Sequence, residues 1–190
     1  MAYLEMDVNE LKKNFDFLNN LFTKNDIKWS IVSKLLCGNK LYLSELLKFD
    51  ISQICDSRLS NIKIIKEMRP EIETIFIKPP SKRIIKGVVK FVDISLNTEI
   101  STIKLLSEEA VKQNKTHKII IMIEMGELRE GIMRNSFIDF YEKVFNLPNI
   151  EVIGIGTNLS CLYGVLPNQD KLIQLSLYKQ LVEAKFKKDI

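Results

Sequence analysis

A single lysine stands near the end of the first apolar, β-type stretch of the chain, residues 29–38 (WSIVSKLLCG). Alternate residues of a strand face opposite sides, so Ser30, Val32 and Lys34 are expected to share one face. Lysine is almost never fully buried without a partner, so an inward-facing amine needs either a route to solvent or a ligand that uses it. The chemistry open to such an amine is Schiff-base formation with an aldehyde. The alternative is a strand-end lysine that bends into solvent.

Four further polar clusters each follow an apolar, β-type stretch. They are residues 56–58 (DSR), 97–99 (NTE), 124–129 (EMGELR) and 157–158 (TN). Polar groups at the carboxyl ends of successive strands are typical of the active-site face of a parallel barrel. Each cluster taken alone could be a helix cap or a turn, but five together favour a common site.

The elements that must position these clusters alternate along the chain. Strands are expected at residues 29–34, 51–55, 72–77, 91–96, 118–123 and 150–155, and helices at about 7–24, 41–48, 58–69, 82–89, 98–113, 137–145 and 169–186. Strands that are apolar on both faces and alternate with helices predict an α/β fold with a parallel sheet. Neither a GxGxxG segment nor a P-loop follows a strand, which argues against the nucleotide-binding open sheets.

Composition limits the remaining possibilities. The 190 residues are enough for one domain, expected to span 1–190, and the net charge of +4 comes from mixed lysine and glutamate without a basic stripe. We therefore expect no nucleic-acid partner. The three cysteines show neither a CxxC pair nor metal-ligand spacing, which predicts no metal site and a reducing, cytoplasmic location. No apolar run is long enough to span a bilayer, and the start lacks the features of a signal peptide.

The wording of five segments resembles a known family. The segments are 32–38 (VSKLLCG), 56–61 (DSRLSN), 95–99 (SLNTE), 122–131 (MIEMGELREG) and 154–161 (GIGTNLSC). In their order and spacing they are similar to the N-terminal part of fold-type III, pyridoxal-phosphate-dependent amino-acid racemases. The similar members are the alanine racemase-like enzymes that include ornithine racemase. This resemblance implies a (β/α)8, TIM-barrel type of fold, which here would be truncated after about six βα units.

The resemblance also implies roles for particular residues. Lys34 matches the lysine that holds pyridoxal 5'-phosphate and moves a proton at the substrate α-carbon. Arg129 matches the arginine near the cofactor's phenolic oxygen and the substrate carboxylate, groups that suit a planar guanidinium. Thr157 and Asn158 match residues at the cofactor's edge. Two further polar positions, Arg58 and Asn97, are expected to face the same pocket.

The match is incomplete in three respects. A closed barrel of this type needs about eight strands, and about six are expected here. The family's phosphate-binding loops after strands seven and eight, and its second catalytic base, a tyrosine from a following β-rich domain, have no counterpart; Tyr163 does not match in context. The chain is therefore interpreted as part of an amino-acid racemase acting on an ornithine- or alanine-like substrate. It would act as a homodimer or paired with a missing C-terminal portion. The alternatives are a truncated, non-catalytic protein that binds pyridoxal phosphate, and an interaction module.

Several other reactive side chains are expected to be structural. His117 precedes a strand and is expected away from the clusters, and Cys37 is expected to be a small buried residue. Glu127 and Glu130 flank Arg129 and are expected to be its solvated neighbours. The alternative is that Glu124 and Glu127 form a paired-carboxylate site for acid–base chemistry. Asp56 is equally suited to cap the helix that follows it or to touch a ligand.

Overall fold

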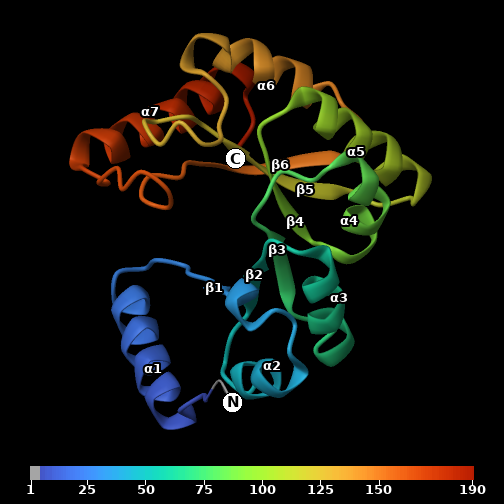
Figure 1. Ribbon diagram of the computed structural model, residues 1–190. Helices are drawn as coiled ribbons and strands as arrows, with labels where there is room; N and C mark the ends of the chain where they lie inside the picture. The colour runs from blue at the N-terminus through green and yellow to red at the C-terminus, as the bar shows by residue number, and fades with distance from the viewer. Residues whose placement is uncertain (1–4) are drawn as a thin grey trace. The chain divides into compact units, whose positions relative to one another are not determined.

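The computed structural model describes residues 5–190, and the chain forms two compact units, residues 1–74 and 75–190 (Figure 1). Each unit is described by itself. Helices and strands alternate along the chain, and within each unit the strands pair in parallel in the order of the sequence. The predicted α/β fold with parallel strands is therefore confirmed. The expectation about the start of the chain rests partly on residues 1–4, which lie outside the described range.

The first unit contains three helices, one 3-10 turn and two strands that pair in parallel, with Ile31 opposite Ile54 and Val32 opposite Cys55. The elements are α1 (Val8–Lys24), β1 (Ile31–Val32), η1 (Ser33–Leu36), α2 (Lys40–Leu46), β2 (Gln53–Asp56) and α3 (Leu59–Met68). The Asp7 carboxylate caps α1 by accepting hydrogen bonds from the first-turn N–H groups of Asn9 and Glu10.

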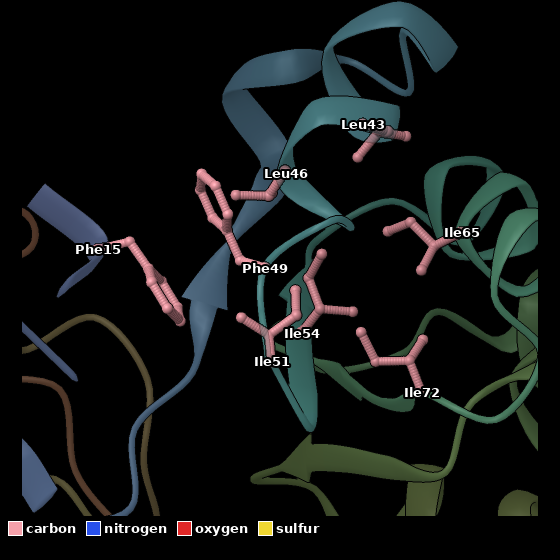
Figure 2. Close-up of a cluster of buried hydrophobic side chains, with 8 residues drawn as sticks. All are labelled: Phe15, Leu43, Leu46, Phe49, Ile51, Ile54, Ile65 and Ile72. Carbon is pink, nitrogen blue, oxygen red and sulfur yellow. The ribbon is translucent and has the colours of Figure 1, made fainter. Parts of the chain in front are cut away.

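An apolar cluster holds this unit together. Figure 2 shows its eight buried side chains, which come from α1, α2, β2, α3 and the segments between them: Phe15, Leu43, Leu46, Phe49, Ile51, Ile54, Ile65 and Ile72. The rings of Phe15 and Phe49 stack with their centroids 4.9 Å apart, which joins α1 to the segment before β2. Because the cluster packs against β2, it fixes the strand whose carboxyl end bears the second polar cluster.

The first strand is much shorter than predicted. It ends at Val32, and Lys34 lies in the 3-10 turn η1 instead of in a strand. The cause is Ser33, whose hydroxyl donates to the Cys55 carbonyl at 3.2 Å and to the Asp56 carboxylate at 2.9 Å. These bonds draw the backbone into a turn, which ends at Cys37 in the left-handed conformation. Within this turn Ser33 is buried and Lys34 is exposed.

The second unit completes the alternation, with β3 beginning at the end of the first unit. Its elements are β3 (Glu73–Phe76), η2 (Lys82–Ile84), α4 (Ile85–Phe91), β4 (Ile94–Asn97), α5 (Ile100–Lys112), β5 (His117–Met122), η3 (Arg134–Ser136), α6 (Phe137–Phe145), β6 (Ile150–Gly156) and α7 (Gln169–Phe186). The bounds of α6 and α7 agree with the prediction. The start of α5 does not: Glu99 is its N-cap residue, and no side chain caps it, so Thr98 does not begin the helix.

The sheet of the second unit is apolar where helices cover it. Ile119 and Ile121 of β5 are fully buried, as are Ile103 of α5 and Tyr141 of α6. Burial raises the pKa of the Tyr141 hydroxyl well above its usual range, so this phenol stays neutral. The packing fixes β5 and β6, whose carboxyl ends bear the remaining loops of interest. Among residues 5–190, no helix combines the length and apolar character that crossing a membrane requires.

Candidate functional site

The turn that carries Lys34 is held by Arg58. The Arg58 guanidinium donates from Nη1 to the Lys34 carbonyl at 3.2 Å and lies 3.4 Å from the Cys37 sulfur. Cys37 is therefore exposed and in contact with an arginine, so the prediction that it is buried is wrong. At Gly38, with φ +74°, a Cβ atom would lie 2.9 Å from the Asn61 side-chain oxygen, so the turn closes tightly on α3. Arg58 thus fixes the Lys34 main chain and leaves the amine exposed.

Asp56 lies beneath this turn and is fully buried. Its Oδ1 accepts from the Arg58 main-chain N–H at 2.8 Å, and the Ser33 hydroxyl donates to its Oδ2 at 2.9 Å. The Asn61 amide donates to both oxygens, at 3.1 and 3.2 Å. Both oxygens are therefore satisfied, as a buried carboxylate requires. Of the two roles left open for Asp56, the structure supports the structural one, because this carboxylate joins the ends of β1 and β2 to the start of α3.

In the second unit, Arg129 lies in a loop that closes on the end of β5, residues 123–133, here called the β5 loop. Ile132 donates its N–H to the Met122 carbonyl at 2.8 Å, and Glu124 donates to the Ile132 carbonyl at 3.1 Å. At Gly131 the backbones touch, because a Cβ atom there would lie 2.3 Å from the Glu124 nitrogen. A shallow hollow of about 230 Å³ lies over this loop, lined by Glu124, Leu128, Arg129, Glu130, Gly131 and Met133.

The acidic neighbours of Arg129 bond to other groups. Glu127 is fully buried, so the prediction that it is a solvated neighbour is wrong; its Oε1 accepts the main-chain N–H groups of Leu162 and Tyr163, the latter at 3.1 Å. Glu130 Oε1 accepts from the Asn158 amide. Within the described part of the chain, no carboxylate forms an ion pair with Arg129. Its guanidinium is therefore available to an anionic ligand.

The backbone conformation of Leu128 separates its two neighbours, because Glu127 points into the protein and Arg129 into solvent. It has φ +53°, in the left-handed region that costs an ordinary side chain about 1–2 kcal/mol. Leu128 itself is 78% exposed, and the neighbouring Glu127 and Arg129 are respectively buried and exposed. Strained backbone of this kind is found mostly where function requires it.

Asn97 belongs to a separate buried chain of hydrogen bonds. Its amide donates to the Ser95 hydroxyl at 2.9 Å, and that hydroxyl lies 2.9 Å from His117 Nε2. Ser95 and His117 are thus joined by a hydrogen bond in which the tautomer of the ring decides the donor. Burial lowers the pKa of His117 to about 4, so the ring is neutral and structural, as expected. The Asn97 side-chain oxygen is buried without a partner among the described residues.

The six predicted site residues thus divide between the units. Lys34 and Arg58 are in contact in the first unit. In the second unit, Asn158 contacts Glu130, the neighbour of Arg129. Thr157 is half-buried, and its hydroxyl lies 3.5 Å from the Asn158 carbonyl. Their assignment to a cofactor remains a prediction.

A family model described as alanine racemase, N-terminal domain, matches residues 6–188. The chain belongs to this family. Among curated proteins, this alanine racemase N-terminal domain is 35% identical over 173 residues to ornithine racemase of Acetoanaerobium sticklandii, covering 90% of the chain and 48% of that protein. It is 25% identical over 185 residues to lysine racemase of Thermotoga maritima, covering 96% of the chain and 51% of that protein. The chain spans about half the length of these relatives.

Solved structures confirm the barrel-type fold of this alanine racemase N-terminal domain. Alanine racemase of Clostridium difficile 630 superimposes with a TM-score of 0.74 at 14% identity, covering 94% of this chain and 47% of that one. PipY of Synechococcus elongatus, solved with PLP bound, superimposes with a TM-score of 0.69 at 10% identity, covering 83% of this chain and 75% of that one. The resemblance of fold seen in the sequence motifs is therefore confirmed.

The racemase-family domain also contains site-supporting residues that the sequence did not reveal. Glu127 and Lys171 are the main ones: Lys171, in the first turn of α7, donates from Nζ to the Met125 carbonyl at 2.6 Å. Both side chains bond to main-chain groups that are distant in sequence. Because every residue has such groups, residue types alone do not reveal these partners.

Proposed function

We propose that this chain is the cofactor-binding portion of a pyridoxal-phosphate-dependent racemase that acts on an ornithine-like amino acid. The observation that carries the proposal is that Lys34 and Arg129 are both exposed, with no ion-pair partner among the described residues, although acidic side chains lie close to each in sequence or space. Charged groups left without counter-charges at strand ends suit the binding of an anionic aldehyde.

The residues present fit such a cofactor. An exposed primary amine on a firmly held turn suits attachment to an aldehyde, and the unpaired guanidinium suits a phenolate or a carboxylate. The buried acceptor of Asn97, which has no partner, is compatible with an approaching donor. Lys34 would hold the cofactor, and Arg129, Asn158 and Thr157 would bind its edge or the substrate carboxylate. Arg58 would fix the lysine through its main chain.

Pyridoxal phosphate, when bound, supplies an electron sink that stabilises a carbanion at the substrate α-carbon. The role of this chain would be to position the amino acid and to move its α-proton with the Lys34 amine. Racemisation requires a proton to be returned on the opposite face, and the second base would come from outside the described residues. The identities of the curated relatives, an ornithine and a lysine racemase, support a substrate with a terminal amine.

The test is borohydride reduction of the purified chain after incubation with pyridoxal phosphate, followed by peptide mass mapping. We expect one phosphopyridoxyl adduct, on Lys34, and none in Lys34→Arg. The matched control is Lys40→Arg, an exposed lysine on α2 that pairs with Glu67 and should leave the labelling of Lys34 unchanged. Adducts scattered over surface lysines would overturn the assignment.

Substrate and reaction are tested separately, on unreduced protein incubated with pyridoxal phosphate in D2O, by following the exchange of the α-hydrogen of L-ornithine and of D-ornithine with solvent. Attachment at Lys34 together with exchange of the α-hydrogen supports the proposal. Attachment at Lys34 without this exchange would instead favour the alternative, a protein that binds pyridoxal phosphate without acting as a racemase.

A further inference from the structure

Two strand-end loops of the second unit are joined by hydrogen bonds, most of them to Glu127, a side chain that the proposed function does not use. One is the β5 loop, residues 123–133, which carries Arg129; the other, here called the β6 loop, is residues 157–168, which carries Asn158. Glu127 accepts two main-chain N–H groups of the β6 loop, from Leu162 and Tyr163. The Asn158–Glu130 bond adds a contact between the same loops.

Glu127 is unusual among these contacts because its side chain has no solvent exposure. A buried carboxylate is costly unless donors surround it, and here two successive N–H groups supply them through Oε1 alone. Its Oε2 is buried without a partner among the described residues. Glu127 is absent from the lining of the hollow over the β5 loop, so its effect on a ligand there must be indirect.

We propose that Glu127 is a positioning residue that docks the β6 loop on the β5 loop, so that Arg129 and Asn158 are held in a single arrangement. The same bonds keep the Glu127 carboxylate away from Arg129, whose guanidinium stays unpaired. What Arg129 and Asn158 bind rests on the proposed function, whereas the docking of the two loops does not.

The docking is measured by amide exchange, followed by NMR, at Leu162 and Tyr163. We expect Glu127→Ala to speed exchange at both amides by about tenfold or more while the buried amides of Ile119 and Ile121 in β5 stay protected, because only local opening is affected. Glu127→Gln should leave exchange within about threefold of the unaltered chain, since its amide oxygen can accept both N–H groups. Glu142→Ala, on an exposed face of α6, is the matched control.

Positioning toward the cofactor is measured by titration with pyridoxal phosphate, followed by its absorbance. Glu127→Ala should weaken binding by about tenfold, the equivalent of one lost net hydrogen bond, and Glu127→Gln should restore it. Should the alanine variant fail to fold, Glu127→Asp replaces it: the charge remains, but the carboxylate is withdrawn by one methylene, and exchange at both amides should rise.

The outcomes separate the two proposals. Unchanged amide exchange in Glu127→Ala overturns the docking. If exchange at Leu162 and Tyr163 rises equally in the alanine and glutamine variants, the docking does not depend on hydrogen bonds accepted by the side chain of residue 127. Faster exchange with unaltered cofactor affinity overturns the positioning role. If the unaltered chain binds no pyridoxal phosphate and Glu127→Ala still speeds exchange in the β6 loop, the proposed function is wrong and the docking is supported.

Discussion

Each unit holds its strand-end residues with one fully buried carboxylate, but the two carboxylates are satisfied in different ways. Asp56 accepts hydrogen bonds at both oxygens, and its donors belong to the 3-10 turn η1, which follows β1, and to the N-cap residue and first turn of α3. Glu127 accepts at one oxygen only, from main-chain groups 35 and 36 positions along the chain. The first arrangement is built on regular elements, whereas the second joins two loops.

The difference suits what each part would have to do. A residue that holds a cofactor covalently needs a fixed main chain, which Asp56 provides beneath the Lys34 turn. The residues that would meet the substrate, including Arg129, lie on loops whose contacts are fewer and more easily exchanged. We therefore expect damage to Asp56 to affect the whole first unit and damage around Glu127 to remain local.

The largest effect is expected for Asp56→Ala. The change removes the acceptor of the Asn61 amide and of the Arg58 main-chain N–H and leaves the Ser33 hydroxyl only the Cys55 carbonyl, which should lower the free energy of unfolding by about 3–5 kcal/mol. Urea unfolding followed by the fluorescence of Trp29, the only tryptophan and a residue of the first unit, reports the loss directly. Asp50→Ala, at an exposed position, should stay within about 0.5 kcal/mol. If Asp56→Ala lowers the free energy of unfolding by less than Glu127→Ala does, the expectation that Asp56 supports more of its unit than Glu127 is wrong.

Gly131→Ala should have the next largest effect, within the second unit. A Cβ atom at residue 131 would lie 2.3 Å from the Glu124 nitrogen, and the backbone has φ +142°. The β5 loop must therefore open, at a cost of about 2–4 kcal/mol. Gly164→Ala is the matched control, because residue 164 has φ +68° but open space around it, so only about 1 kcal/mol is at stake. The two variants are compared by urea unfolding followed by circular dichroism, and equal losses would show that the close approach at Gly131 does not matter.

Sequence reasoning succeeded where local rules decide the structure. The bounds of α6 follow from its strong helical periodicity and the proline before β6, and α7 begins directly after Asn168, whose side chain caps it. The prediction was wrong where contacts between distant residues decide the structure. β1 ends early because Ser33 bonds to Asp56, and Glu127 is buried because main-chain N–H groups beyond residue 160 donate hydrogen bonds to it. A glutamate within a charged run is usually solvated, and nothing in that run announces a main-chain partner.

Lowering the pH should weaken the second unit through His117. Burial lowers the pKa of this histidine to about 4; the charge of Asp93 opposes this shift to a smaller extent, and the charge of Lys115 adds slightly to it. The unfolded chain, with an ordinary histidine, binds a proton near pH 6.5, so the stabilising contribution is complete above that pH and is lost as the pH falls toward 4. Between pH 7 and pH 5 the loss is about 2 kcal/mol. Urea unfolding at the two pH values measures it.

His117→Gln is the control for that pH dependence. The glutamine amide can form a hydrogen bond with the Ser95 hydroxyl in place of Nε2, but the amide does not titrate. The variant should therefore lose most of the difference between pH 7 and pH 5. A difference as large as in the unaltered chain would show that His117 does not cause the pH dependence.

Lys171→Met should have the smallest effect and refines the comparison most. Methionine keeps most of the length of the lysine stem but removes the ammonium that donates to the Met125 carbonyl at 2.6 Å, at a cost of about 1 kcal/mol. Lys185→Met, on an exposed part of α7, is the control. If Lys171 and Glu127 hold the same pair of loops, the double variant should differ from the sum of the single ones by about 0.5 kcal/mol or more, because contacts within one network are coupled. Additive losses would mean that α7 and Glu127 hold the β5 loop independently, so that the loops lack the mutual support that distinguishes the Asp56 cluster.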